Sequence, residues 1–166
     1  MSFNWTNPYP TVRTPVFARN LVATSQPLAA QAGLRLLQSG GNAVDAACAM
    51  LAAVATMWDT LGWGGETQAL IYNPKTKKVV GINALGVAPT GATPEFYRQK
   101  GMKYPPEYGP LAAVTPGTPG GLMVMLAEFG TMSLGDVLAP AIEMAEGYPI
   151  EAQAADDFPL LQLMAR

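Results

Sequence analysis

Three segments of this sequence contain residue types and spacings that could do chemistry: Gly62–Thr67, Asn83–Pro89 and Pro116–Gly121. Clustered glycines let a backbone approach a ligand closely, and successive N–H groups in such a loop can bind an anion. The first segment has no Lys or Ser/Thr at the spacing of a phosphate-binding loop, so it gives little support for a nucleotide site. A tight turn explains the first segment more simply, and the start of a helix explains the third. For the second segment, a strand end and a binding role are equally good interpretations.

Histidine is absent from all 166 residues, and cysteine occurs once, as Cys48. Histidine triads, histidine metal ligands and histidine general bases are therefore excluded within this chain. Cys48 lies in a run of apolar residues, where a free cysteine is interpreted as a small core residue rather than a catalytic thiol. We expect no catalytic residue, no metal site and no cofactor in this chain, and a single cysteine cannot form an internal disulfide.

Two consecutive helices joined by Gly40-Gly41 are the first elements that must position these residues. Ser25 is predicted to cap the first helix, with Pro27 tolerated in its first turn, and the diglycine is predicted to end it. Asn42 is predicted to cap the second helix. From Ala43 to Met57 almost every residue is Ala, Val, Leu, Met or Cys, so the second helix has no polar face. Such a helix is typical of a protein interior, and we predict that it is central and buried.

Short strands and helices are predicted around that centre. Residues 67–72 and 78–83 are predicted to form a hairpin, because two β-rich runs flank a turn that contains Asn and Pro. Ser133 is predicted to cap the last helix, in which Pro140 marks a kink or the first turn. Further elements are expected as strands at 16–24 and 111–115, a short helix opened by Thr93-Pro94-Glu95, and a helix ending at Phe129. This order of elements indicates a mixed α/β chain with an antiparallel sheet.

Four segments, in the same order along the chain, resemble the γ-glutamyltranspeptidase family. VATSQPLAAQAGLRLLQSGGNAVDAA at 22–47 is similar to the opening segment of the family, and GWGGETQALIY at 62–72 resembles its glycine-rich strand start. NALGVAPTGATPEFY at 83–97 is similar to its AP-x-x-ATP-x-x-F segment, and the run at 113–150 resembles its VPGT-x-x-GL…L-x-P-A-I region. The matches cover roughly residues 20–150, and several motifs in the right order make the resemblance more specific than any single one.

This resemblance implies an αββα-sandwich fold of the N-terminal nucleophile hydrolases, in the α/β (α+β) class, of which this chain is a partial large subunit. In such enzymes a precursor cuts itself, and a new N-terminal Thr on the second subunit becomes the nucleophile. Residues 1–15 are then an irregular N-terminal arm, and residues 16–166 are the N-terminal portion of the large subunit. The implied partners are a small-subunit chain carrying that Thr and a small-molecule amide substrate, in a heterodimer or a dimer of heterodimers.

The segment that starts at Asn83 departs from the pattern of γ-glutamyltranspeptidases. With the register fixed on Ala88-Pro89, Leu85 stands where the family carries the Arg that binds the substrate α-carboxylate, and Gly86 stands where it carries Glu. A related amidohydrolase group, oxamate amidohydrolase among them, fits better, although Val87 stands at its Arg position. Neither guanidinium is present, and Leu or Val cannot pair a carboxylate bidentately. The candidate substrate-binding residues are therefore Asn83, Leu85, Gly86 and Val87.

These features favour an amide hydrolase or acyltransferase acting on a small molecule that lacks, or does not use, a glutamyl α-carboxylate. A true γ-glutamyltransferase or glutathione hydrolase is an alternative, and so is a non-catalytic binding or structural homologue. A net charge of −2 without a basic stripe argues against a nucleic-acid partner. The apolar run at 43–57 is too short to span a bilayer, so no membrane partner is expected. The first 15 residues contain no apolar signal core, so a cytoplasmic location is expected.

Overall fold

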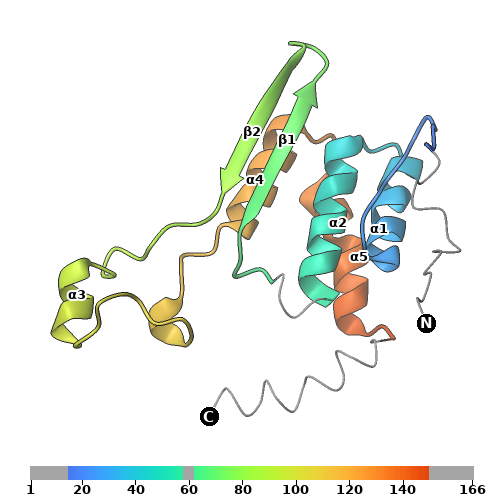
Figure 1. Cartoon of the computed structure of the whole chain (residues 1–166). Coiled ribbons are helices and arrows are strands. Elements are labelled where there is room, and N and C mark those ends of the chain that lie inside the picture. Colours follow the sequence, from blue (N-terminus) through green and yellow to red (C-terminus); the bar gives the residue numbers. More distant parts are fainter. Residues whose placement is uncertain (1–14, 58–61, 150–166) are drawn as a thin grey trace, which may run out of the picture.

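A computed structural model describes residues 15–57 and 62–149, which combine helices with one antiparallel hairpin (Figure 1). The elements are α1 (Pro27–Gln38), α2 (Ala43–Met57), β1 (Thr67–Asn73), β2 (Lys78–Ala84), α3 (Pro94–Gln99), the 3-10 helix η1 (Pro110–Ala112), α4 (Thr118–Phe129) and α5 (Leu134–Glu146). The hairpin lies against α4, and α2, α5 and α1 form the helical part beside it. The predicted arm at residues 1–15 lies outside the described residues, apart from Pro15.

α1 ends in a tight turn made by the diglycine, as the sequence predicts. Gly40 has a φ of +95°, which a residue without a Cβ adopts without penalty. The Gly41 N–H donates to the Leu36 carbonyl at 2.9 Å, and the Gly40 N–H donates to the Leu37 carbonyl at 3.2 Å. These two bonds satisfy carbonyls that a helix end leaves without intrahelical partners, and they let α2 turn back along α1.

The chain before α1 differs from its prediction in two respects. Residues 16–24 are irregular rather than a strand, because a strand needs a neighbour for its backbone groups and no described segment pairs with this one. The predicted Ser25 cap is also wrong. Gln26 immediately precedes α1 and makes no side-chain cap bond, while Pro27 occupies the first turn, where its missing N–H costs nothing.

A reciprocal cap between Asn42 and Asp45 begins α2 and confirms Asn42 as the predicted cap. Asn42 Oδ1 accepts from the N–H groups of Val44 at 2.7 Å and Asp45 at 3.1 Å, while Asp45 Oδ2 accepts from the Asn42 N–H at 2.7 Å. Asp45 is fully buried and also accepts from the N–H groups of Thr131 and Met132. The pair therefore ties the start of α2 to the turn between α4 and α5.

β1 and β2 form the predicted hairpin, and each strand runs one residue further than predicted. Side chains alternate between the two faces of the hairpin. The face toward α4 packs against the core through Ala69, Ile71 and Ile82. The opposite face presents Leu70, Tyr72 and Val79, which are 82%, 61% and 63% exposed. No segment among the described residues covers this second face.

α2 is the centre of the helical part, as predicted. It packs against α1, α4 and α5, and its most deeply buried apolar residues are Cys48, Ala49, Ala52 and Ala53. These side chains are small, so the neighbouring helices can approach α2 closely. Ala43 and Ala47 are exposed to solvent in this structure. Burial of every face of α2 therefore stays a prediction for the assembled protein.

Between β2 and α4 the chain leaves the body of the protein and returns (Figure 1). α3 lies in this excursion and is capped by Thr93 as predicted, with the Phe96 N–H donating to the Thr93 hydroxyl at 3.2 Å. The strand predicted at 111–115 is wrong, because a proline opens the 3-10 helix there and only Thr115 pairs, with Val87. That single pairing closes the base of the excursion.

α5 begins after Ser133, whose hydroxyl accepts from the Asp136 N–H at 3.1 Å, as predicted. Pro140 lies inside α5 rather than in its first turn, and it is buried. An exposed ion pair of 2.8 Å joins Arg35 of α1 to Glu143 of α5. Across residues 15–57 and 62–149, no helix combines the length and apolar character needed to cross a bilayer.

Candidate functional site

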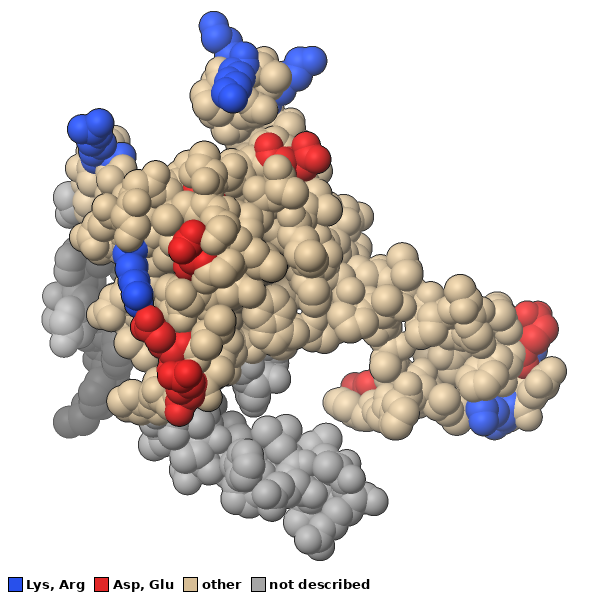
Figure 2. All heavy atoms as spheres, turned by 180° about the vertical axis from the view of Figure 1, so that it is seen from behind, with Lys and Arg blue, Asp and Glu red and all other residues tan. Residues whose placement is uncertain are grey.

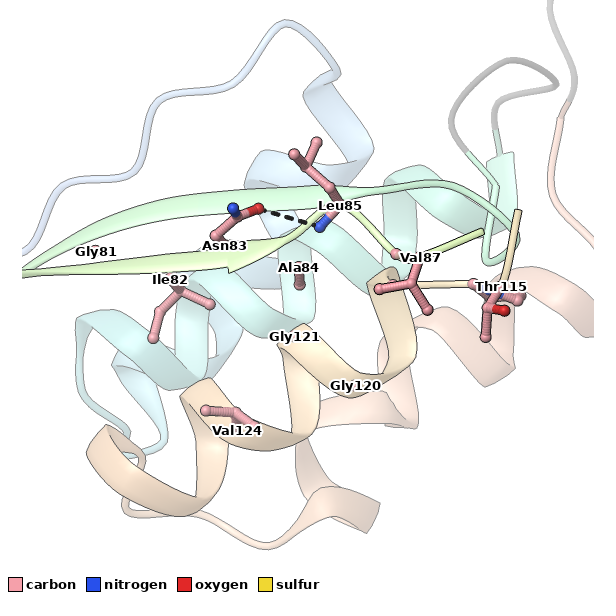
Figure 3. Close-up of a pocket in the computed structure, with 13 residues that line it drawn as sticks. Gly81, Ile82, Asn83, Ala84, Leu85, Val87, Thr115, Gly120, Gly121 and Val124 are labelled. Carbon is pink, nitrogen blue, oxygen red and sulfur yellow. Dashed lines mark hydrogen bonds between the residues drawn. The ribbon is translucent and has the colours of Figure 1, made fainter. Parts of the chain in front are cut away.

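A pocket of about 620 Å³ lies where the end of β2 meets the start of α4 (Figure 3). One wall contains all four candidate binding residues, and the other comes from the segment that leads into α4 and from its first turns. Thirteen residues line the pocket: Gly81–Val87, Thr115–Gly117, Gly120, Gly121 and Val124. Two of the segments singled out in the sequence therefore form one site.

Asn83 and Leu85 lie on the side of β2 that faces away from α4, whereas Ile82 and Ala84 point toward it (Figure 3). Asn83 Oδ1 accepts from the Leu85 N–H at 3.3 Å. The side-chain NH₂ group of Asn83 is a donor and can bond a carbonyl of a ligand. Leu85 is 40% exposed and offers only apolar surface.

Gly86 and Val87 continue this wall through the backbone. Gly86 has a φ of +82°, and a Cβ there would collide with the carbonyl oxygen of Thr115. Glycine is therefore required at this position by the path of the chain. The Val87 carbonyl accepts from the Thr115 N–H at 2.8 Å, and Val87 as a residue is 68% exposed. The role of these four residues in substrate binding stays a prediction.

The two glycine-rich loops brace each other beside the pocket. The Gly65 carbonyl accepts from the N–H groups of Gly117 at 3.0 Å and Thr118 at 3.1 Å, and the Thr67 and Thr118 hydroxyls are 3.3 Å apart. The Gly65 N–H closes a turn on the Gly62 carbonyl at 3.0 Å. The simpler interpretations, a turn and the start of a helix, thus agree with the structure. The N–H groups of Gly117 and Thr118, at the start of α4, donate to the Gly65 carbonyl and are therefore not free to bind an anion.

No charged side chain lines the pocket, and its polar side chains are Asn83 and Thr115. The described residues contain no group of three or more His, Cys, Asp or Glu side chains that could hold a metal ion. The pocket wall can therefore recognise a ligand through shape, apolar contact and a few hydrogen bonds. Its lining contains no acidic or basic side chain that could activate the Thr115 hydroxyl for a covalent step.

The two buried ionisable side chains of α2 do not supply such a group. Burial, and secondly the charge of Asp45, raise the pKa of Cys48 to about 11, so the thiol is neutral near pH 7. Burial also tends to raise the pKa of Asp45. Hydrogen bonds from Thr131, Asn42 and Met132 outweigh that effect and hold the Asp45 pKa below its ordinary value. Cys48 is thus a core residue, as predicted, and Asp45 has a structural role.

The sequence places the segment at 116–121 among three that could do chemistry but favours the start of a helix, and it gives no sign that this segment meets the one at 83–89 in a pocket. The helix already begins at Thr118, so Gly120 and Gly121 lie in its first turns. A usable signal is the spacing of Gly117 and Gly121, four residues apart and so on one side of a helix. Two glycines on one face indicate that another backbone approaches there, although not which one.

The fold defines the class of protein. The structure is similar to cephalosporin acylase from Bacillus halodurans, with a TM-score of 0.79 and 41% identity, over 94% of this chain and 30% of the acylase chain. It is also similar to γ-glutamyltranspeptidase from Helicobacter pylori, with a TM-score of 0.77 and 33% identity, over 93% of this chain and 45% of the other. These similarities confirm the predicted α+β fold of the N-terminal nucleophile hydrolases, of which the chain covers a part.

The family follows from the sequence match. The family model for γ-glutamyltranspeptidase matches residues 29–162. The glutathione hydrolase proenzyme of Bacillus subtilis (strain 168) is 36% identical over 142 residues, which are 82% of this chain and 24% of that protein. The chain therefore belongs to the γ-glutamyltranspeptidase family, as its motifs predict, and it spans about a quarter of the length of this relative.

Proposed function

We propose that this chain is part of an autoprocessed amide hydrolase or acyltransferase that acts on a small-molecule amide with an uncharged acyl group. In this proposal the chain forms one wall of the acyl pocket, and a second, small-subunit chain contributes an N-terminal Thr as nucleophile. The α-amine of that Thr serves as the base, so no histidine is needed. Family membership supports amide chemistry, and the relatives named proenzymes support processing into two chains. In this proposal the two chains form a heterodimer or a dimer of heterodimers, and the enzyme is located in the cytoplasm.

The proposed preference for an uncharged acyl group follows from the pocket lining, which contains no charged side chain. A substrate α-carboxylate at Leu85 and Val87 would lose water without gaining a cationic partner, which is unfavourable. On the face shown in Figure 2, lysine and arginine side chains stand at the hairpin turn, at the outer end of the excursion and at two places on the helical side. The surface between the hairpin turn and the excursion carries acidic side chains near the hairpin and is otherwise free of charge. A neutral acyl group, held by apolar contacts and the Asn83 amide, suits this wall better than a glutamyl group.

The test compares kcat/KM for a γ-glutamyl anilide and a neutral acyl anilide on the complete processed enzyme. A missing charge-assisted hydrogen bond costs about 1.5–3 kcal/mol, so the neutral compound should be preferred at least about tenfold. Leu85→Arg should narrow this preference by placing a guanidinium in the pocket. Thr76→Arg adds the same charge at the hairpin turn, outside the pocket lining, and should leave the preference unchanged.

A γ-glutamyltransferase or glutathione hydrolase is the second candidate, because the Bacillus subtilis relative is named a glutathione hydrolase. In that case residues outside the described part of the chain supply the positive charge. A wild-type preference for the glutamyl compound would establish this candidate and overturn the neutral-acyl proposal. Turnover of neither compound, by enzyme carrying the N-terminal Thr, would favour a non-catalytic homologue.

A further inference from the structure

The end of β2 lies against the start of α4 with almost no space between their backbones. A Cβ on Gly121 would come within 2.6 Å of the Ala84 Cβ, and a Cβ on Gly117 would overlap the Ala84 carbonyl oxygen and the Gly86 nitrogen. Gly117 and Gly121 are both buried. Because packed interiors leave no spare volume, any added atom must push the strand end away from the helix.

The same close approach determines where the pocket wall stands. Ala84 lies between Asn83 and Leu85, and Gly86 leads directly to Val87, so these residues move together with the strand end. The other wall contains Gly117 and Gly121 themselves. The two walls meet at this contact, so the separation of β2 from α4 there determines how far apart the walls stand beyond it. In a pocket without charge, width and shape are the main means of selecting an acyl group.

We propose that Gly117 and Gly121 are positioning residues that set the width of the acyl pocket by acting through Ala84 and Gly86. The backbone contact fixes how far apart the pocket walls stand, and so limits the size of the uncharged acyl group that fits between them. This inference rests on the proposed function. Neither glycine has a side chain that could touch the substrate, so the effect is exerted through the neighbouring strand.

The structure distinguishes the two glycines by the atoms that they face, which allows a matched rescue experiment. In the complete processed enzyme, Gly121→Ala should raise KM for an acetyl anilide about tenfold with kcat close to wild type, because it displaces a binding wall and not the nucleophile. Adding Ala84→Gly removes the one close atom and should return KM to within about twofold of wild type. The methyl group added by Gly117→Ala would meet backbone atoms of Ala84 and Gly86, which Ala84→Gly does not remove. Ala84→Gly should therefore not restore KM in the Gly117→Ala variant.

Gly135→Ala is the control for an added helical methyl group. Gly135 lies in α5, and its Cβ would meet only the Ser133 hydroxyl oxygen at an ordinary 3.7 Å, so KM should not change. If Gly121→Ala yields no soluble enzyme, Ala84→Gly alone replaces it. This variant removes the Cβ that faces Gly121, so the strand end can settle closer to α4, and it should lower kcat/KM for a bulky acyl anilide relative to the acetyl compound.

Several outcomes would overturn the inference. These are an unchanged KM in Gly121→Ala, a fall in kcat alone, failure of Ala84→Gly to restore KM, or an unchanged acyl preference in Ala84→Gly. A wild-type enzyme that hydrolyses no acyl anilide would overturn the proposed function as well. A wild-type enzyme that is active, with variants that keep its KM, would overturn only the role of the glycines.

Discussion

Asp45 shows how the partners of a single residue decide what it does. It lies in an apolar helix and is fully buried, where a lone carboxylate would be strongly unfavourable. Four donors surround it: the N–H groups of Asn42, Thr131 and Met132, and the Thr131 hydroxyl at 2.6 Å. They hold the Asp45 pKa below its ordinary value despite burial, so the group is ionised at neutral pH. Its function is to fasten α2 to the turn before α5, not to exchange protons.

Asp45→Asn should lower the free energy of unfolding of the complete protein by about 3 kcal/mol at pH 7, because an amide cannot accept all four bonds. The folded-state pKa of Asp45 lies below its unfolded value of about 3.9, so its stabilisation is present above about pH 4 and is lost as the pH falls toward the folded pKa. Urea unfolding should therefore show a gap between wild type and variant that shrinks below about pH 4. Glu128→Gln, at an exposed position of α4, should show no such gap. A gap that is constant from pH 7 to pH 3 would contradict this assignment.

At the scale of elements, α2 is a helix whose neighbours are brought close by small side chains. Ala49 and Ala52 belong to the main core cluster with Leu122 and Val137, while Ala53 packs in a second cluster with residues of α1. α2 therefore joins the α1 side of the protein to the side that carries α4 and the hairpin. Since α4 forms one wall of the pocket, the position of α2 also supports the candidate site.

Ala52→Asp should destabilise the complete protein by several kcal/mol, because it places an unpaired charge and extra volume at a position with no exposed surface. Ala145→Asp makes the same change at an exposed position of α5 and should cost less than about 0.5 kcal/mol. Thermal unfolding of the two variants beside wild type gives the comparison. Equal melting temperatures for both variants would show that α2 is not packed as described.

At the scale of the whole molecule, one large apolar surface has no cover among the described residues. Leu70, Tyr72 and Val79 stand on the outer face of the hairpin, and Tyr72 lies directly opposite Val79 in the strand register. Contiguous exposed apolar side chains of this kind are typical of a surface that another part of a protein covers. The length of the curated relative is consistent with that, since this chain matches about a quarter of it.

The polypeptide of residues 1–166 by itself should therefore be insoluble or lack a cooperative thermal transition. Size-exclusion chromatography and thermal circular dichroism would test this, and a monodisperse monomer with a sharp transition would contradict it. Leu70→Lys combined with Val79→Lys should raise the soluble fraction of the isolated polypeptide. Gln99→Lys, at an already exposed end of α3, should not.

Features whose causes lie within a few residues could be predicted before the fold was known. The diglycine end of α1 and the caps at Asn42, Thr93 and Ser133 depend on neighbours in the chain, and all are observed. The hairpin is equally local, because its turn and its alternating strands are adjacent. The family and the α+β fold could also be predicted, because the motifs that indicate them are contiguous segments of the sequence. For the candidate site, sequence reasoning found one wall, the segment at 83–87.

The contacts between distant segments could not be predicted in this way and are seen only in the folded chain. The second wall of the pocket comes from the start of α4, and Asp45 finds partners 86 and 87 residues away. The strand predicted at 16–24 failed because a β-rich run becomes a strand only when another segment pairs with it. At 111–115 a 3-10 helix opened by a proline takes the place of the strand, and only Thr115 pairs. A pocket between backbones depends on the distance between two elements, and no short stretch of sequence specifies that distance. Packing specifies it, here through the contact of Gly117 and Gly121 with the end of β2.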